Sequence, residues 1–64
     1  MIKVNGKELQ IREITLREYL KQEGYETSRI AVECNGSIVP KEEYAKKILR
    51  DGDALEVVSF VGGG

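Results

Sequence analysis

Two Asn-Gly dipeptides, Asn5-Gly6 and Asn35-Gly36, place tight turns in a chain of only 64 residues. Residues 1–4 alternate apolar and polar side chains before the first dipeptide, and a second alternating run follows it, with Leu9 and Ile11 on one face. A two-residue type I′ hairpin turn needs positive φ at both positions, which Asn and Gly adopt at low cost. The pattern therefore predicts that the chain begins with a β-hairpin.

A capping-box motif marks the start of a helix. Thr15 is followed three residues later by Glu18, the pairing in which a Thr hydroxyl and a Glu carboxylate satisfy free N–H groups at a helix N-terminus. Gly24 is typical of a C-terminal stop. The helix is therefore predicted over about residues 16–23, and the apolar residues that share one of its faces are Leu16, Tyr19 and Leu20.

The second Asn-Gly dipeptide joins two further strands. Alternation over residues 30–34 predicts a strand with Cys34 on its core face, and Ile38 and Val39 begin a shorter strand that Pro40 stops. A free cysteine is among the most buried residue types, and no basic residue adjoins Cys34 in the sequence to activate its thiol. We therefore assign Cys34 to the core and not to a reactive site.

The remaining segments complete an α+β pattern. Residues 41–49 are mostly charged, with apolar side chains at helical spacing, so we expect a short helix or 3₁₀ helix with solvated lysines and glutamates. Residues 51–53 predict a turn, and residues 54–61 form the last and most apolar strand, which belongs in the middle of a sheet. The order predicts a β-grasp (ubiquitin-like) fold, with one main helix packed across a mixed four- or five-stranded sheet. We expect residues 1–61 to form this domain and residues 62–64 a flexible glycine tail.

Composition removes several classes of function. Ten basic and eleven acidic residues leave a net charge of −1, which gives no electrostatic case for binding nucleic acid or an anionic membrane. No apolar run is long enough to span a bilayer, and no secretory leader is recognisable, so a cytoplasmic protein, monomeric when free, is expected. A single cysteine and no histidine leave no internal disulfide, no usual zinc or copper site, and no base for a nucleophilic Ser59.

The last strand carries a second apolar surface. Because strand side chains alternate, Leu55 and Val57 face the helix while Val58 and Phe60 face the other way. Three interpretations of Phe60 remain open: an incidental exposed side chain, a docking patch, or a residue buried by local packing.

Three consecutive glycines, Gly62 to Gly64, follow this strand. They are either an inert flexible end or a segment that threads a narrow channel, because no Cβ blocks its approach. In the second case the α-carboxylate of Gly64 is the one reactive group presented, and adenylation converts it to an acyl donor.

Taken together, these motifs resemble the ThiS family of ubiquitin-like sulfur carriers of thiamine biosynthesis, over essentially the whole chain. The segments that carry the resemblance are Val4-Asn5-Gly6, Thr15 with the short helix, residues 30–36, residues 38–41, Tyr44, Asp51-Gly52-Asp53, residues 55–58 and the Gly63-Gly64 end.

The resemblance implies a mechanism in which the chain is a protein co-substrate and not an enzyme. An E1-like adenylating enzyme of the ThiF type uses ATP to activate Gly64, and a cysteine desulfurase system supplies persulfide sulfur. The resulting thiocarboxylate donates its sulfur to a thiazole synthase of the ThiG type. No bound cofactor is implied; Gly62 and Gly63 provide reach, and Val58 and Phe60 are the expected partner-binding residues.

Three alternatives remain open from the sequence. The first is a MoaD-type sulfur carrier for molybdopterin synthesis. The second is a ubiquitin-like modifier whose Gly64 forms an isopeptide bond with lysine. The third is a plain β-grasp binding module with an inert tail.

Overall fold

The computed structural model describes residues 1–60 of the chain. Five strands form a mixed sheet in the order β2-β1-β7-β4-β5: β1 (Ile2–Val4), β2 (Lys7–Leu9), β4 (Ile30–Cys34), β5 (Ser37–Ile38) and β7 (Ala54–Ser59). A separate antiparallel ribbon pairs β3 (Glu13–Thr15) with β6 (Ile48–Arg50). The helices are α1 (Leu16–Gln22) and two 3₁₀ turns, η1 (Thr27–Arg29) and η2 (Lys41–Glu43).

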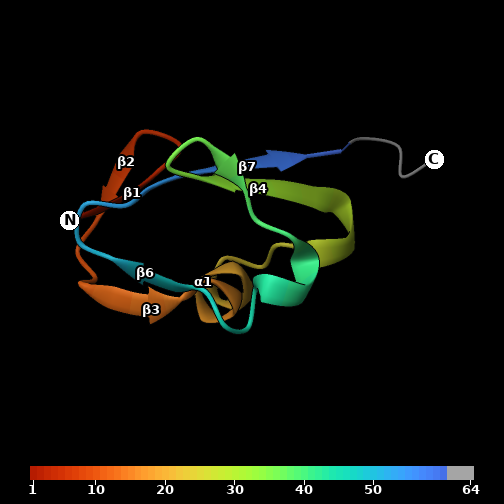
Figure 1. Ribbon diagram of the computed structural model, residues 1–64, viewed down its shortest axis with the longest axis horizontal. Helices are drawn as coiled ribbons and strands as arrows, with labels where there is room; N and C mark the ends of the chain where they lie inside the picture. Colours follow the sequence, from red (N-terminus) through yellow and green to blue (C-terminus); the bar gives the residue numbers. More distant parts are fainter. Residues whose placement is uncertain (61–64) are drawn as a thin grey trace.

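Strand β7 lies at the centre of the five-stranded sheet, as its apolar sequence predicted. It pairs in parallel with β1 and antiparallel with β4, while β2 and β5 form the two edges. Figure 1 shows α1 and the β3–β6 ribbon on one side of this sheet, with the opposite face left uncovered by residues 1–60. This arrangement is the β-grasp fold expected from the sequence.

The core lies between α1 and the covered face of the sheet. Alternation along β1, β4 and β7 points every second side chain toward the helix. Burying each large apolar side chain of this kind contributes roughly 1.5–3 kcal/mol. The buried apolar residues are Ile2, Val4, Leu16, Tyr19, Leu20, Ile30, Val32, Cys34, Val39, Tyr44, Leu49, Leu55 and Val57.

The N-terminus of α1 is satisfied by both side-chain and backbone acceptors. The hydroxyl of Thr15 accepts from the N–H of Glu18 at 3.2 Å, as the capping motif predicted. The N–H groups of Leu16 and Arg17 donate to carbonyls of the segment before β6, at 2.8 and 3.0 Å. The helix ends one residue before the expected Glu23, which is its C-cap. The first turn of α1 is thereby bound to the segment that follows η2.

Both Asn-Gly dipeptides form the predicted turns with positive φ, 51° and 84° at Asn5-Gly6 and 53° and 87° at Asn35-Gly36. Each asparagine also binds β7 through its side chain. Oδ1 of Asn5 accepts from the N–H of Val57 at 2.9 Å, and Oδ1 of Asn35 accepts from the N–H of Ala54 at 2.9 Å. The two turns therefore hold the central strand from its two sides.

Local structure differs from the sequence expectations at three points, although the expected 3₁₀ helix is present at Lys41–Glu43. Only Lys41–Glu43 is 3₁₀ helical within the segment 41–49; Ile48 and Leu49 belong to β6, with Leu49 fully buried and Ile48 partly exposed. Strand β3 has no counterpart among the predicted elements, and β2 ends at Leu9, so that Ile11 lies beyond it. Two of these errors share a cause: β3 and β6 are three residues long and are strands because they pair with each other.

Candidate functional site

The face of the five-stranded sheet opposite α1 is the candidate docking site. Leu55 and Val57 are buried, whereas Val58 is 56% and Phe60 53% exposed. The alternation predicted for β7 is therefore observed, and the interpretation of Phe60 as a residue buried by local packing is wrong.

Backbone hydrogen bonds hold the C-terminal end of β7 in place. The ladder with β4 runs as far as the pair of Ser59 with Ile30. One further bond joins the N–H of Phe60 to the carbonyl of Arg29 at 2.7 Å. The segment that follows Phe60 thus leaves from an anchored residue at one end of the sheet. Val61 and the three glycines, including the predicted reactive Gly64, lie outside the described residues.

The register of the sheet adds residues that sequence reasoning missed. Ala31 of β4 lies opposite Val58, and Glu33 lies opposite Glu56. On its other side Glu33 pairs with Ile38 of the edge strand β5, whose side chain is 71% exposed. We call the surface formed by these side chains the outer sheet face; it comprises Ala31, Glu33, Ile38, Glu56, Val58 and Phe60.

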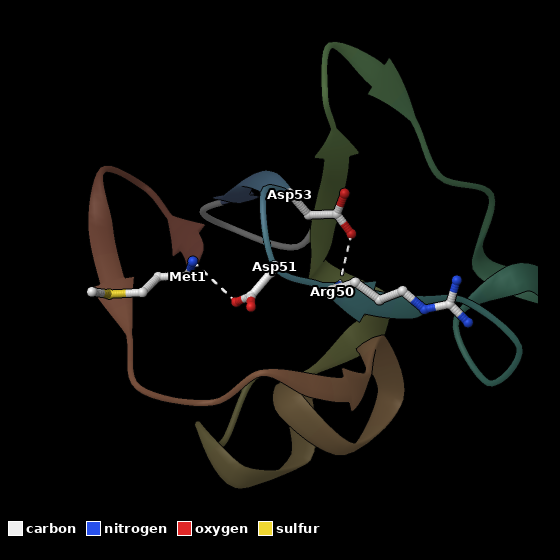
Figure 2. A network of polar contacts seen from close by, with 4 residues as sticks. All are labelled: Met1, Arg50, Asp51 and Asp53. Carbon is white, nitrogen blue, oxygen red and sulfur yellow. Dashed lines mark hydrogen bonds and ion pairs between the residues drawn. The ribbon is translucent and has the colours of Figure 1, made fainter.

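The turn between β6 and β7 is bound to the N-terminus of the chain and to the Asn35-Gly36 turn. Figure 2 shows Asp53 facing the backbone N–H of Arg50, to which it binds at 2.9 Å, and Asp51 facing the amino group of Met1 at 3.0 Å. Asp53 also accepts from the side-chain amide of Asn35 at 3.0 Å. The Arg50 and Asn35 donors hold the pKa of the Asp53 carboxyl below its ordinary value, because they stabilise its ionised form. These bonds fix the start of β7.

Cys34 lies in the core, with 6% of its surface exposed. Burial raises the pKa of its thiol, and Asp53 acts in the same direction, while Lys47 acts to lower it. The expectation that no basic residue adjoins this thiol was therefore incomplete: Lys47 is distant in sequence but near in space, and both line a surface pocket of about 210 Å³. Burial remains the largest effect, so the geometry does not favour a reactive thiolate.

Neither a membrane-spanning helix nor a metal-binding cluster occurs among the described residues. No helix within residues 1–60 is long and apolar enough to cross a bilayer. Over the same range, no three His, Cys, Asp or Glu residues gather in a way that could hold a metal ion.

Comparison with known proteins identifies the family. The sequence profile of the ThiS family matches residues 2–64. The sulfur carrier protein ThiS of Bacillus subtilis is 36% identical, and the match covers all of both chains. A thiazole synthase of Paramagnetospirillum magneticum is 42% identical over 95% of this chain, which spans only 19% of that longer protein. The crystal structure of the thiamine biosynthesis protein ThiS from Geobacter metallireducens superposes with a TM-score of 0.79, at 30% identity, over 98% of this chain and 97% of the other. The chain belongs to the ThiS family of sulfur carrier proteins.

Proposed function

We propose that this chain carries sulfur as a thiocarboxylate on Gly64 and delivers it for thiazole formation. The observation that carries the proposal is the match of this chain to the ThiS family over residues 2–64. That match includes the three glycines at positions 62–64. A carboxylate oxygen of Gly64 attacks the α-phosphorus of ATP and releases pyrophosphate. The terminal sulfur of a protein persulfide then attacks the acyl carbon and expels AMP, and a thiol reduces the remaining S–S bond to leave the thiocarboxylate.

The anchored end of β7 sets how far the reactive group reaches. Phe60 is held by its bond to Arg29, and four residues follow it. An extended chain spans at most about 3.3–3.6 Å per residue, so four residues give Gly64 a maximum reach of roughly 14 Å from Phe60. A partner that activates Gly64 must therefore place its catalytic centre within this distance of the docked carrier.

Two partners follow from this chemistry. An E1-like adenylating enzyme of the ThiF type binds the ATP, so the carrier itself needs no cofactor and acts as co-substrate. A thiazole synthase of the ThiG type accepts the sulfur; the thiazole synthase relatives that contain a segment similar to this chain support that pairing. Dependence on ATP and a desulfurase is consistent with action in the cytoplasm.

The deciding experiment is mass spectrometry after incubation with the adenylating enzyme, ATP and a sulfur source. Exchange of oxygen for sulfur adds nearly the same mass as oxidation of Met1 or Cys34. Trypsin cleavage after Arg50 removes this ambiguity, because the peptide 51–64 contains neither methionine nor cysteine. We expect the mass increase on this peptide and none in a variant that lacks Gly64. An unmodified peptide with a competent enzyme present would favour the inert-tail alternative.

The docking role of Val58 and Phe60 has its own test. Phe60→Asp is expected to weaken binding of the adenylating enzyme at least tenfold, because it places a charge in an apolar contact, while the unfolding midpoint stays close to wild type. Ile48→Asp is the control, since Ile48 is partly exposed, at 38%, and lies in the β3–β6 ribbon, outside the five-stranded sheet. Equal binding by the Phe60 variant and wild type would remove Phe60 from the docking surface.

A further inference from the structure

The outer sheet face contains two glutamates that oppose each other. Glu33 of β4 lies directly across from Glu56 of β7, and both side chains are exposed. The ion pairs found within residues 1–60 join Met1 to Asp51 and Arg29 to Glu26, so neither neutralises this pair. Like charges directly opposite each other destabilise a sheet. The pair therefore weakens the isolated fold, and folding does not account for it.

The surroundings of the pair are apolar. Ile38 of β5 lies opposite Glu33, and Val58 is the next residue of β7 on this face, two residues after Glu56. On the same side of the sheet, Lys3 of β1 lies opposite Glu8 on one strand and Ala54 on the other, and so is out of register with both Glu33 and Glu56. The face thus combines two unneutralised carboxylates with exposed apolar side chains, the pattern that a partner of opposite charge complements.

We propose that Glu33 and Glu56 together receive an arginine or lysine side chain of a thiazole synthase, whose adjacent apolar residues cover Ile38 and Val58. This inference rests on the proposed function and names the recognition chemistry of that partner. A thiazole synthase that contains its own carrier-like segment needs no encounter by diffusion, whereas a separate carrier does, and opposite charges accelerate that encounter. A second copy of this chain docked through the same face would bring four carboxylates together, which opposes self-association.

The experiment compares two double variants that remove the same charge. Glu33→Gln with Glu56→Gln neutralises the pair; Glu13→Gln with Glu42→Gln neutralises two exposed glutamates outside the five-stranded sheet. Association of each with purified thiazole synthase of the ThiG type is followed by stopped flow over a range of salt concentrations. We expect the first variant to associate about tenfold more slowly at low salt, with a flattened salt dependence, and the second within about twofold of wild type.

A second measurement excludes a structural explanation. Relief of the like-charge pair is expected to raise the thermal unfolding midpoint of the first variant by roughly 2–4 °C, so slower association cannot result from a damaged fold. Unchanged association, equal slowing by both double variants, or a lowered midpoint overturns the proposal. Slowing seen with the adenylating enzyme but not with thiazole synthase overturns the assigned partner. Sulfur loading of wild-type Gly64 is assayed separately, so failure of the proposed function is recognised on its own.

Discussion

The side chain of Asn5 offers a direct test of what holds the central strand. Its Oδ1 accepts from the N–H of Val57 at 2.9 Å, its Nδ2 reaches the carbonyl of Val57 at 3.4 Å, and its own φ is 51°. Asn5 therefore combines two effects. Its side chain accepts a hydrogen bond from β7 just beyond the end of β1, and its backbone adopts the left-handed conformation. Three substitutions separate them.

Asn5→Gly keeps the backbone conformation and removes the acceptor. A partly buried N–H left without its partner costs about 1–2 kcal/mol, and the greater freedom of glycine in the unfolded chain adds about 0.5 kcal/mol, for a total of about 2 kcal/mol. Asn5→Ala loses the same acceptor and adds at least about 1 kcal/mol for a left-handed φ. Asn5→Asp keeps both the acceptor and tolerance of this φ, but replaces the Nδ2 donor that faces the Val57 carbonyl at 3.4 Å with a second oxygen, so a loss of about 1 kcal/mol, smaller than that of Asn5→Gly, is expected.

The assay is urea and thermal unfolding followed by circular dichroism. In a domain of this size about 2 kcal/mol lowers the unfolding midpoint by roughly 8–16 °C, a loss readily separated from that of Asn5→Asp. Amide exchange at Val57 is expected to accelerate in the glycine variant relative to the aspartate variant. If Asn5→Asp is as unstable as Asn5→Gly, or if neither differs from wild type, the acceptor does not brace β7 and the reasoning fails.

Further predictions concern Asp53, Leu49 and Cys34. Since the folded pKa of Asp53 lies below its unfolded value, its stabilisation is present above about pH 4 and is lost as pH falls through the folded value; the stability gap between wild type and Asp53→Asn in urea unfolding should therefore shrink at low pH. Leu49→Ala should cost roughly 2–5 kcal/mol because Leu49 is fully buried, whereas circular dichroism should find a smaller loss for Ile48→Ala, since Ile48 is partly exposed. Burial raises the pKa of the Cys34 thiol, so a thiol reagent should modify native protein far more slowly than urea-unfolded protein, and Cys34→Ala should load sulfur normally.

Short-range signals explain which parts of the fold are predictable from sequence. Asn5-Gly6 and the Thr15–Glu18 cap act within a few residues, so the first hairpin and the start of α1 follow from the sequence directly. Strand β6 has no such signal. The side chains of Ile48 and Leu49 fit a helix as well as a strand over so short a stretch, and only their pairing with β3 decides between them.

Some features of the candidate site are likewise predictable from the sequence, and others are not. The exposure of Val58 follows from alternation within one strand, which the sequence displays. The opposition of Glu33 and Glu56 depends instead on the register between β4 and β7, and the approach of Lys47 to Cys34 depends on tertiary packing. No spacing in the sequence encodes either contact, because each joins segments whose relative position the whole fold determines.

In strand β7, different groups hold the strand in the sheet and face a partner. Its backbone is bound by β1, β4 and the side chains of Asn5 and Asn35, and its buried side chains, Leu55 and Val57, complete the core. Its outer side chains add little to folding, and at Glu56 they oppose it. Changes on the outer sheet face should therefore alter partner binding at nearly constant stability, whereas loss of a bracing asparagine should lower stability yet leave the binding of each folded molecule intact. A carrier built in this way can adapt its surface to a partner without moving Phe60, the residue from which its C-terminal segment extends.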